Sequence, residues 1–472
     1  MEFDLVVLNG TLHQAHGSQP GDIGVRDGEI VEVVPAGILA GRSAGRVIEA
    51  AGLDVIPGCI DPHVHLDLKI SDAITTCDDF ESGSRAAACG GITTLIDFAT
   101  PEPGETLQQA HDAWLARADG NSLVDYAWHM CLTDDSHLHQ IDEMLRLGIP
   151  TFKEFMIYEE RGLRSDDGRI LETLRMMKQL GGMLLLHAES PEVLDHLVAT
   201  RHDRELMQRY GARLHAMTRP DYVEAEAVQR AILWSEVTGG PLYLVHLSTA
   251  RSADLIEAAR KRGVPVTGET CPQYLVLDDS VFEREEDGHV FASCPQVKKP
   301  GDSERLWAAL EAAGSAHEIL STVGTDTCSF TRAQKDTWGG DFTKIPMGLP
   351  GLDTMVPIMY THGVQTGRLT MNQLVSLCST NAANLMGLGD RKGSLQAGYD
   401  ADIVIIDPEH KKAVDWRSLQ SRCDWSPYQG MELGGFAKMT IARGRVVVDE
   451  YEVVEEGEAV GCGEFLRRKG RG

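Results

Sequence analysis

Residues 57–67 read PGCIDPHVHLD and join a short apolar run to two histidines that stand one residue apart. Side chains at positions i and i+2 of a β-strand point to the same face, so His63 and His65 are expected to lie side by side where this strand ends. Two neighbouring imidazoles can hold one metal ion between them. The pair is more informative here than an isolated HxH pattern, because it directly follows a strand of the buried type.

Apolar runs of this kind recur along the middle of the chain. They span residues 54–60, 91–99, 123–132, 149–157, 181–188, 241–247, 264–270 and 321–326, and helical patterns such as 191–202 and 252–263 separate several of them. Nearly continuous apolar runs are typical of parallel strands that are covered on both faces. Eight such units favour an α/β fold with a closed (β/α)8 TIM barrel. An open doubly wound sheet is the alternative, but no GxGxxG or GxxxxGK[ST] loop supports a nucleotide-binding version.

Both ends of the chain show a different pattern, of short strands separated by turn residues. The strand-like segments are 4–10, 22–34 and 46–52 near the N-terminus and 400–407 and 439–450 near the C-terminus. The pairs Asn9-Gly10 and Asp27-Gly28 suit tight turns between strands. We expect the two ends to pair into one small sheet domain, which requires them to lie close together in space.

The composition is that of a globular protein, since 42% of the 472 residues are hydrophobic and 24% are charged. The net charge of −27 disfavours nucleic acid and anionic membranes as partners. The 10 cysteines form no CxxC pair, so we expect reduced thiols rather than a disulfide framework. Because we find neither a membrane-length apolar run nor a signal-peptide pattern, we expect a cytoplasmic protein.

Four more candidate ligands stand at or near the ends of predicted strands: Lys153, His187, His246 and Asp326. The carboxyl ends of all strands of a barrel converge on one face, where active sites lie. A set of histidines and an aspartate suits Zn²⁺, with Mn²⁺ or Fe²⁺ as alternatives. Each residue alone has a simpler interpretation, as a hydrogen-bonded core histidine, an ion-paired lysine or a capping aspartate. The metal hypothesis therefore rests on their joint placement.

The sequence resembles the hydantoinase/dihydropyrimidinase branch of the amidohydrolase superfamily, and is most similar to its phenylhydantoinase-like members. The resemblance runs through nearly the whole chain and includes PGCIDPHVH, FKEFMIY, LLLHAES, LYLVHLSTA, GETCPQYL, GTDTCSF and KGSLQAGYDADIVIID. It implies a β-sandwich domain built from residues 1–56 and 392–472 around a barrel of residues 57–391.

The resemblance also implies a site with two divalent metal ions, most simply Zn²⁺. His63, His65 and Asp326 would hold one ion, His187 and His246 the other, and a carboxylated Lys153 would bridge them. A hydroxide shared by the ions would attack a ring carbonyl of a cyclic amide, a hydantoin or a dihydropyrimidine, to give an N-carbamoyl amino acid. Asp326 would move the proton, and Tyr158 would donate a hydrogen bond to the developing oxyanion. Ser293 and Met347 match positions whose backbone contacts the substrate.

Departures from the family pattern concern the substrate rather than the metal ligands. Thr327 stands where members commonly carry histidine, Met347 replaces an asparagine, and SCPQVKK replaces an SPPLR-like run around Ser293. One alternative function is that of an allantoinase or a dihydroorotase, although we see no arginine near the ligand motifs to clamp a dihydroorotate carboxylate. The alternative of another class is a non-catalytic dihydropyrimidinase-related scaffold, which the intact ligand set argues against. The resemblance implies a homotetramer.

Overall fold

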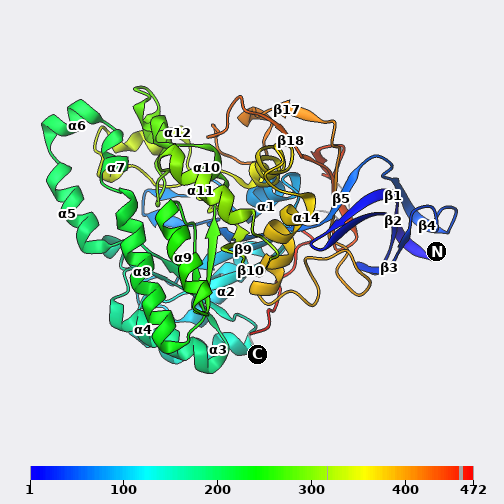
Figure 1. The fold of residues 1–472 in the computed structure, drawn as a ribbon, viewed down its shortest axis with the longest axis horizontal. Coiled ribbons are helices and arrows are strands. Elements are labelled where there is room, and N and C mark those ends of the chain that lie inside the picture. The colour runs from blue at the N-terminus through cyan, green and yellow to red at the C-terminus, as the bar shows by residue number, and fades with distance from the viewer. Residues whose placement is uncertain (1, 316, 456–460, 471–472) are drawn as a thin grey trace.

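The structure, a computed structural model, describes residues 2–315, 317–455 and 461–470. Eight parallel strands form a barrel, and each strand pairs with the next one along the chain. The strands are β6 (Cys59–Val64), β9 (Ile92–Ala99), β10 (Asp125–Cys131), β11 (Thr151–Phe155), β12 (Met183–His187), β13 (Leu242–Leu244), β14 (Val266–Thr270) and β15 (Leu320–Val323). The prediction of a TIM barrel with a separate sheet unit is confirmed (Figure 1).

The barrel closes where β6 and β15 end. Val64 forms a parallel bridge with Thr327, the Asp326 N–H donates to the His63 carbonyl at 2.9 Å, and the His65 N–H donates to the Thr327 carbonyl at 2.8 Å. Closure therefore brings the HxH pair and the last candidate ligand together, although more than 250 residues separate them in the sequence.

Helices cover the outside of the barrel, as the buried strands require (Figure 1). They are α1 (Phe80–Cys89), α2 (Leu107–Ala118), α3 (Ile141–Arg146), α4 (Asp167–Leu180), α5 (Pro191–Arg201), α6 (Arg204–Tyr210), α7 (Arg213–Met217), α8 (Asp221–Thr238), α9 (Ala250–Lys261), α10 (Pro272–Val276), α11 (Pro300–Leu310), α12 (Arg332–Lys335), α13 (Met355–Ile358), α14 (Met371–Val375) and α15 (Asn381–Leu385). Short hairpins, β7 (Lys69–Ser71) with β8 (Ile74–Thr75) and β17 (Lys411–Ala413) with β18 (Glu432–Gly434), complete this part of the molecule.

A nine-stranded sheet joins the two ends of the chain, on the right of Figure 1. Its strands are β1 (Phe3–Gln14), β2 (Gly17–Arg26), β3 (Glu29–Pro35), β4 (Ala44–Glu49), β5 (Asp54–Pro57), β16 (Ile403–Ile406), β19 (Ala437–Ala442), β20 (Arg445–Asp449) and β21 (Glu452–Val453). The antiparallel pairing of β5 with β16 connects the N-terminal strands to the C-terminal ones. Side chains from both ends, among them Val7, Ile23 and Ile403, share one apolar core.

Two local predictions were wrong. The predicted strand 54–60 is divided, because Asp54–Pro57 belongs to the terminal sheet and the barrel strand begins at Cys59. Asn9 and Gly10 lie inside β1, where the register with β2 shifts and Asn9 takes a φ of 61°; they form a bulge rather than a turn. The Asn9 N–H donates to Asp22 Oδ1 at 2.8 Å, which supports that backbone conformation. Asp27 and Gly28 do form the tight turn between β2 and β3.

The last described segment, residues 461–470, lies against the barrel and not in the terminal sheet. The Tyr126 N–H donates to the Glu464 carbonyl at 3.0 Å, and the Leu466 N–H donates to the Tyr126 carbonyl at 2.8 Å. Phe465 stacks on Trp128 with ring centroids 4.7 Å apart. This aromatic contact, together with the strand-like pairing, holds the tail to β10.

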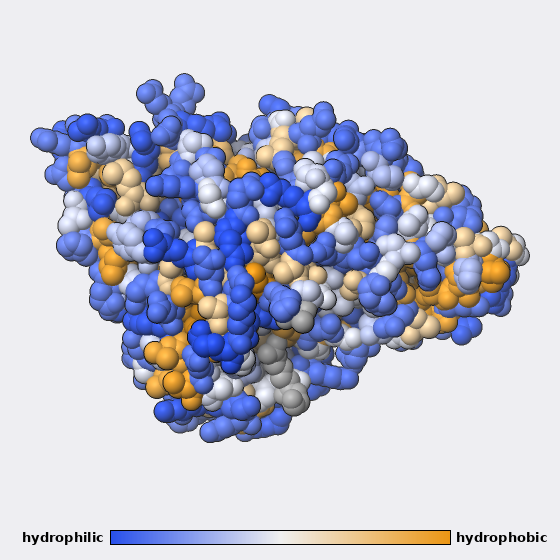
Figure 2. Space-filling model, in the orientation of Figure 1, coloured by the Kyte–Doolittle hydropathy of each residue, from blue (hydrophilic) through white to orange (hydrophobic). Residues whose placement is uncertain are grey.

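The surface is largely hydrophilic on the face drawn in Figure 2, with hydrophobic side chains scattered between charged ones. Within the described ranges, none of the helices combines the length and the apolar character that crossing a bilayer demands.

Candidate metal centre and active site

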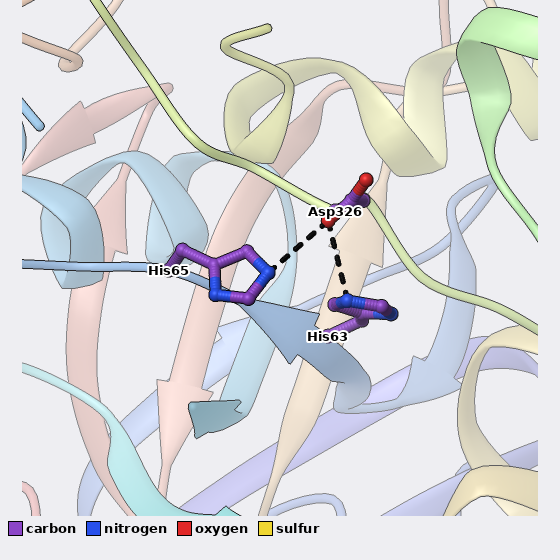
Figure 3. Close-up of side chains that lie close together, drawn as sticks. All are labelled: His63, His65 and Asp326. Atoms are coloured by element: carbon purple, nitrogen blue, oxygen red, sulfur yellow. Dashed lines mark ion pairs between the residues drawn. The ribbon is translucent and has the colours of Figure 1, made fainter. Parts of the chain in front are cut away.

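His63, His65 and Asp326 meet at the carboxyl end of the barrel (Figure 3). Each histidine places its Nε2 atom 3.2 Å from Asp326 Oδ1. His63 Nε2 is buried and makes no hydrogen bond to any described residue. Two imidazole nitrogens and a carboxylate oxygen that converge in this way form a donor set that fits a divalent cation.

Glu269, in β14, fixes the orientation of His63. Its Oε1 atom lies 2.7 Å from His63 Nδ1 and accepts the His246 backbone N–H at 3.1 Å, while Oε2 accepts the Tyr243 hydroxyl at 2.7 Å. Burial opposes protonation of His63, but the charges of Glu269 and Asp326 outweigh it and raise the pKa of His63 to about 9. A histidine that donates Nδ1–H to a carboxylate presents its other nitrogen to a metal, an arrangement common in metal sites.

His187 and His246 form the second half of the cluster. Their ring centroids are 4.5 Å apart, and the His246 ring lies 5.3 Å from that of His63. His187 Nε2 lies 3.0 Å from Glu189 Oε2, so the Nδ1 atom of the same ring is the one left for a ligand role. Burial would raise the pKa of Glu189, but the hydrogen bond from His187 and the charge of Arg219 lower it to about 2.

Lys153 lies in β11, which follows the strand of His63 and His65 along the chain and precedes those of His187 and His246. Its side chain is almost completely buried. Its Nζ atom sits 4.9 Å from the centre of the Phe98 ring and 5.0 Å from that of Phe155. Among the described residues it has neither a carboxylate partner within 4.0 Å nor a hydrogen bond. Burial lowers the pKa of Lys153 to about 8, so a substantial share of the amine is neutral near physiological pH.

Three residues of the site have left-handed backbone conformations that non-glycine residues rarely adopt. The φ angles are 74° at Tyr158, 40° at His246 and 52° at Asp326. Such strain persists only where the surrounding structure enforces it, and it is concentrated at functional sites. Each of the three lies two or three positions after the end of a barrel strand, and its side chain lines the pocket.

The catalytic pocket is a small cavity of 60 Å³ above these residues. Besides the six candidate ligands it is lined by Tyr158, Met347, Gly348, Leu68, Ile70, Thr100, Phe155, Arg161, Leu163, Cys294 and Cys328. A larger cavity of 740 Å³ lies at the opposite ends of β14 and β15 and includes none of the candidate ligands in its lining. The chemistry of the donor set, rather than cavity size, decides which of the two is the candidate active site.

Of the other predicted site residues, Tyr158 and Met347 line the pocket and Ser293 does not. The Tyr158 ring lies 5.4 Å from the His187 ring, and burial raises the pKa of its phenol well above the usual value, so it stays a hydrogen-bond donor. Met347 lines the pocket and receives a contact from Arg219 Nη2 at 3.7 Å. Ser293 does not line the pocket; its hydroxyl donates to the Pro295 carbonyl, and its own carbonyl accepts from His215 at 2.8 Å. Its contact with substrate stays a prediction.

Sequence reasoning missed three residues that matter here. Glu269 and Glu189 orient the histidines, and each lies in a motif that was noted without a role, GETCPQYL and LLLHAES. We expected no arginine near the ligand motifs, and this prediction was wrong, because Arg161 lines the pocket. Both ring nitrogens of His129 are engaged, by Thr151 and by the Pro62 carbonyl, which indicates a structural role.

Comparison with known proteins matches residues 55–447 to the model of the amidohydrolase family. The D-hydantoinase of Geobacillus stearothermophilus is 38% identical over 98% of this chain and 96% of its own length. The chain belongs to the hydantoinase branch of the amidohydrolase family. A crystal structure of a D-hydantoinase superposes with a TM-score of 0.93 at 37% identity, over 99% of both chains. The dihydropyrimidinase of Brevibacillus agri gives a TM-score of 0.93 at 34% identity, again over 99% of both chains.

Two departures of this chain from the family pattern lie next to candidate ligands, at Thr327 and Cys294. Thr327, where members commonly carry histidine, is buried, and its hydroxyl has no hydrogen-bond partner among the described residues. Cys294 occupies the loop of the SPPLR-like run, and its thiol donates to Glu189 Oε2 at 2.9 Å. Both positions lie beside candidate ligands without replacing one, so they change the surroundings of the candidate donor set and not its members.

Proposed function

We propose that this chain is a metal-dependent cyclic amidohydrolase that opens a hydantoin or dihydropyrimidine ring to an N-carbamoyl product. Full-length relatives named D-hydantoinase and dihydropyrimidinase support the reaction class. The observation that carries the proposal is the buried Lys153 amine, which lies among four histidines and an aspartate and has no ion-pair partner among the described residues. A buried ammonium without a counter-ion is unfavourable, whereas a neutral amine can add CO₂ and release one proton to solvent to become an anionic carbamate ligand.

The proposed donor set fits two divalent cations. His63, His65 and Asp326 would hold one ion, and His187 and His246 the other, with a carboxylated Lys153 between them; Zn²⁺ is the proposed metal. The orphaned His63 Nε2 and the carboxylate partners of His63 and His187 support this assignment. When bound, two such cations lower the pKa of water so that hydroxide is available near neutral pH.

The protein's own groups then position the ring and move one proton. Asp326 Oδ1 would take the proton from the nucleophile and pass it to the amide nitrogen that leaves. The Tyr158 phenol, kept protonated by burial, would donate to the carbonyl oxygen as it gains charge. The backbone of Ser293 and Met347 would hold the ring amide, and the apolar wall formed by Leu68, Ile70 and Leu163 would limit the access of water.

Assaying hydantoin, dihydrouracil and allantoin side by side with metal-loaded protein tests the proposal. Ring opening of hydantoin or dihydrouracil that is lost on chelation and restored by Zn²⁺ is the expected result. Opening of allantoin alone would support the allantoinase alternative. Protein that takes up no metal and keeps an unmodified Lys153, as read by metal analysis and intact mass, would instead support the non-catalytic scaffold.

The proposed assembly is a homotetramer located in the cytoplasm. Figure 2 shows hydrophobic side chains gathered over the part of the face where α4 and α8 lie. Leu233 and Val237, both in α8, are 55% and 68% exposed, respectively. Large exposed aliphatic side chains of this kind are typical of contact surfaces between subunits, so α8 is the place to test by substitution to Glu and light scattering.

A further inference from the structure

The loop that follows β11 carries two arginines with different surroundings. It includes Tyr158 and a short 3-10 helix, η2 (Glu159–Arg161), and leads towards α4. Arg164 is neutralised, because its Nη2 atom lies 2.6 Å from Glu192 Oε1 and its Nη1 atom lies 3.7 Å from Glu159 Oε2. Arg161 forms no ion pair and no side-chain hydrogen bond with any residue that the structure describes.

Arg161 is instead directed at the catalytic pocket. It belongs to the pocket lining, and its guanidinium carbon lies 5.4 Å from the centre of the Tyr158 ring. Tyr158 is the residue assigned to the carbonyl that is attacked, so the guanidinium stands beside the substrate and not at a remote surface. The remaining wall near it is apolar, formed by Leu68, Ile70, Phe155 and Leu163.

The charge of Arg161 is therefore available to a ligand. A chain with a net charge of −27 has many carboxylates that could pair with an arginine, yet none does so here among the described residues. Among the described residues that line the pocket, the only carboxylate is that of Asp326, which already lies 3.2 Å from both His63 and His65. A guanidinium presents a rigid fork of donors that matches a carboxylate, and it gains most from one in an apolar setting with restricted water.

We propose that Arg161 selects substrates with an anionic substituent, so that the preferred substrates are cyclic amides that carry a short carboxylate-bearing side chain. This inference rests on the proposed function and names its substrate class. The guanidinium carbon of Arg161 lies 5.4 Å from the centre of the Tyr158 ring, so a carboxylate on a short side chain of the cyclic amide can reach it. Arg161 acts in this scheme as a specificity residue that binds the substituent and leaves the chemistry to the other groups.

A matched pair of substrates tests the proposal: hydantoin-5-acetic acid and its amide, which differ in charge but hardly in shape. Metal-loaded wild-type protein is expected to favour the acid in kcat/KM by about tenfold or more, the range of one hydrogen-bonded charge pair. Arg161→Gln should bring the acid-to-amide ratio close to one through a higher KM for the acid, and Arg161→Lys should retain part of the preference. Arg164→Gln is the control, and its ratio should equal that of the wild type.

Added salt should reduce the wild-type preference, since it screens the ion pair. A wild-type ratio of one or below, or a ratio that survives Arg161→Gln, would overturn the inference while leaving the ring-opening function intact. Arg161-dependent opening of dihydroorotate, whose carboxylate is attached to the ring, would overturn the assignment to a side chain. Failure to open either hydantoin or dihydrouracil, with or without a substituent, would reject the proposed function itself, and this inference with it.

Discussion

Lys153 and Lys392 are both buried, at 1% and 3% exposure, and yet their surroundings are opposite. Lys392 joins the barrel to the terminal sheet, and its Nζ atom lies 2.6 Å from Asp125, 2.6 Å from Asp402 and 3.0 Å from Asp400. Lys153 stands in the candidate active site with aromatic rings and histidines around it and no carboxylate within 4.0 Å among the described residues.

The difference shows that partners, not burial, decide what a buried lysine does. Burial lowers the pKa of both amines, but three carboxylates reverse the effect at Lys392 and raise its pKa above the usual value. At Lys153 the charges of Asp326 and Glu269 oppose this effect but do not outweigh it, and the pKa falls to about 8. Lys392 is therefore a permanent cation that holds two parts of the fold together, while Lys153 is an amine that can react.

Replacing Lys153 with Ala should have the largest effect on activity. Under the proposed assignment this variant would lack the carboxylate that two metal ions share, and ring opening should fall about a thousandfold or more, the equivalent of several kcal/mol of transition-state stabilisation. Added acetate or propionate should restore part of the rate. Steady-state assays with and without the acid measure both effects, and a near wild-type rate without added acid would refute the bridging role.

Replacing Lys392 with Met should instead affect stability. Removing the cation leaves buried carboxylates without their partner, which typically costs about 3–5 kcal/mol of unfolding free energy. Denaturant unfolding measures the loss. Arg391→Gln is the matched control, because Arg391 pairs with Asp400 from a side chain that is 38% exposed, and surface pairs contribute no more than about 1 kcal/mol. Equal stability of Lys392→Met and wild type would show that the carboxylates do not need this lysine.

Glu269→Gln should weaken metal binding without unfolding the protein. The amide no longer accepts the His63 Nδ1–H as a charged partner, and such changes usually reduce metal affinity or activity about 10–100-fold. Competition with a chelator measures the affinity. Tyr243→Phe removes the contacts of the Tyr243 hydroxyl to Glu269 Oε2 and to Thr322 Oγ1 but leaves the bond between Glu269 and His63 in place, so it should have a smaller effect; the reverse order would mean that Glu269 does not act through His63.

The smallest effect concerns pH. Only the neutral amine adds CO₂, so reactivation of metal-free, decarboxylated protein at fixed dissolved CO₂ should rise about tenfold per pH unit below pH 8 and level off above it. An unperturbed lysine would keep rising towards pH 10.5. Reactivation by Zn²⁺ at a series of pH values measures this profile. Mass spectrometry under CO₂ should show no carbamate on Lys335, a buried lysine whose pKa is lowered to about 7 but which is not among the residues that line the candidate active site.

Local pattern was enough to predict several features of this protein. Seven of the eight apolar runs correspond to barrel strands, and the first, 54–60, contains the start of one. The lining of one pocket includes His63, His65, Lys153, His187, His246 and Asp326, because strand ends in a barrel must converge. The Asp27-Gly28 turn was also predictable, since its residues suit positive φ angles. In each of these cases the information resides within a few neighbouring residues.

The remaining features depend on which distant side chains meet. The sequence alone does not reveal that Glu269 contacts His63. It does not show that Lys392 pairs with three aspartates, while Lys153 pairs with none among the described residues. Nor does it show that Arg161 lines the pocket while Arg164 pairs with Glu192. Asn9 and Gly10 would make a turn in isolation, but they become a bulge because the hydrogen bond to Asp22 and the pairing of β1 continue past them. Residue types and their spacing determined where reactive groups stand along the chain. Only the tertiary structure decided their charge states and partners, because electrostatic energies depend on distances that the closure of the barrel sets.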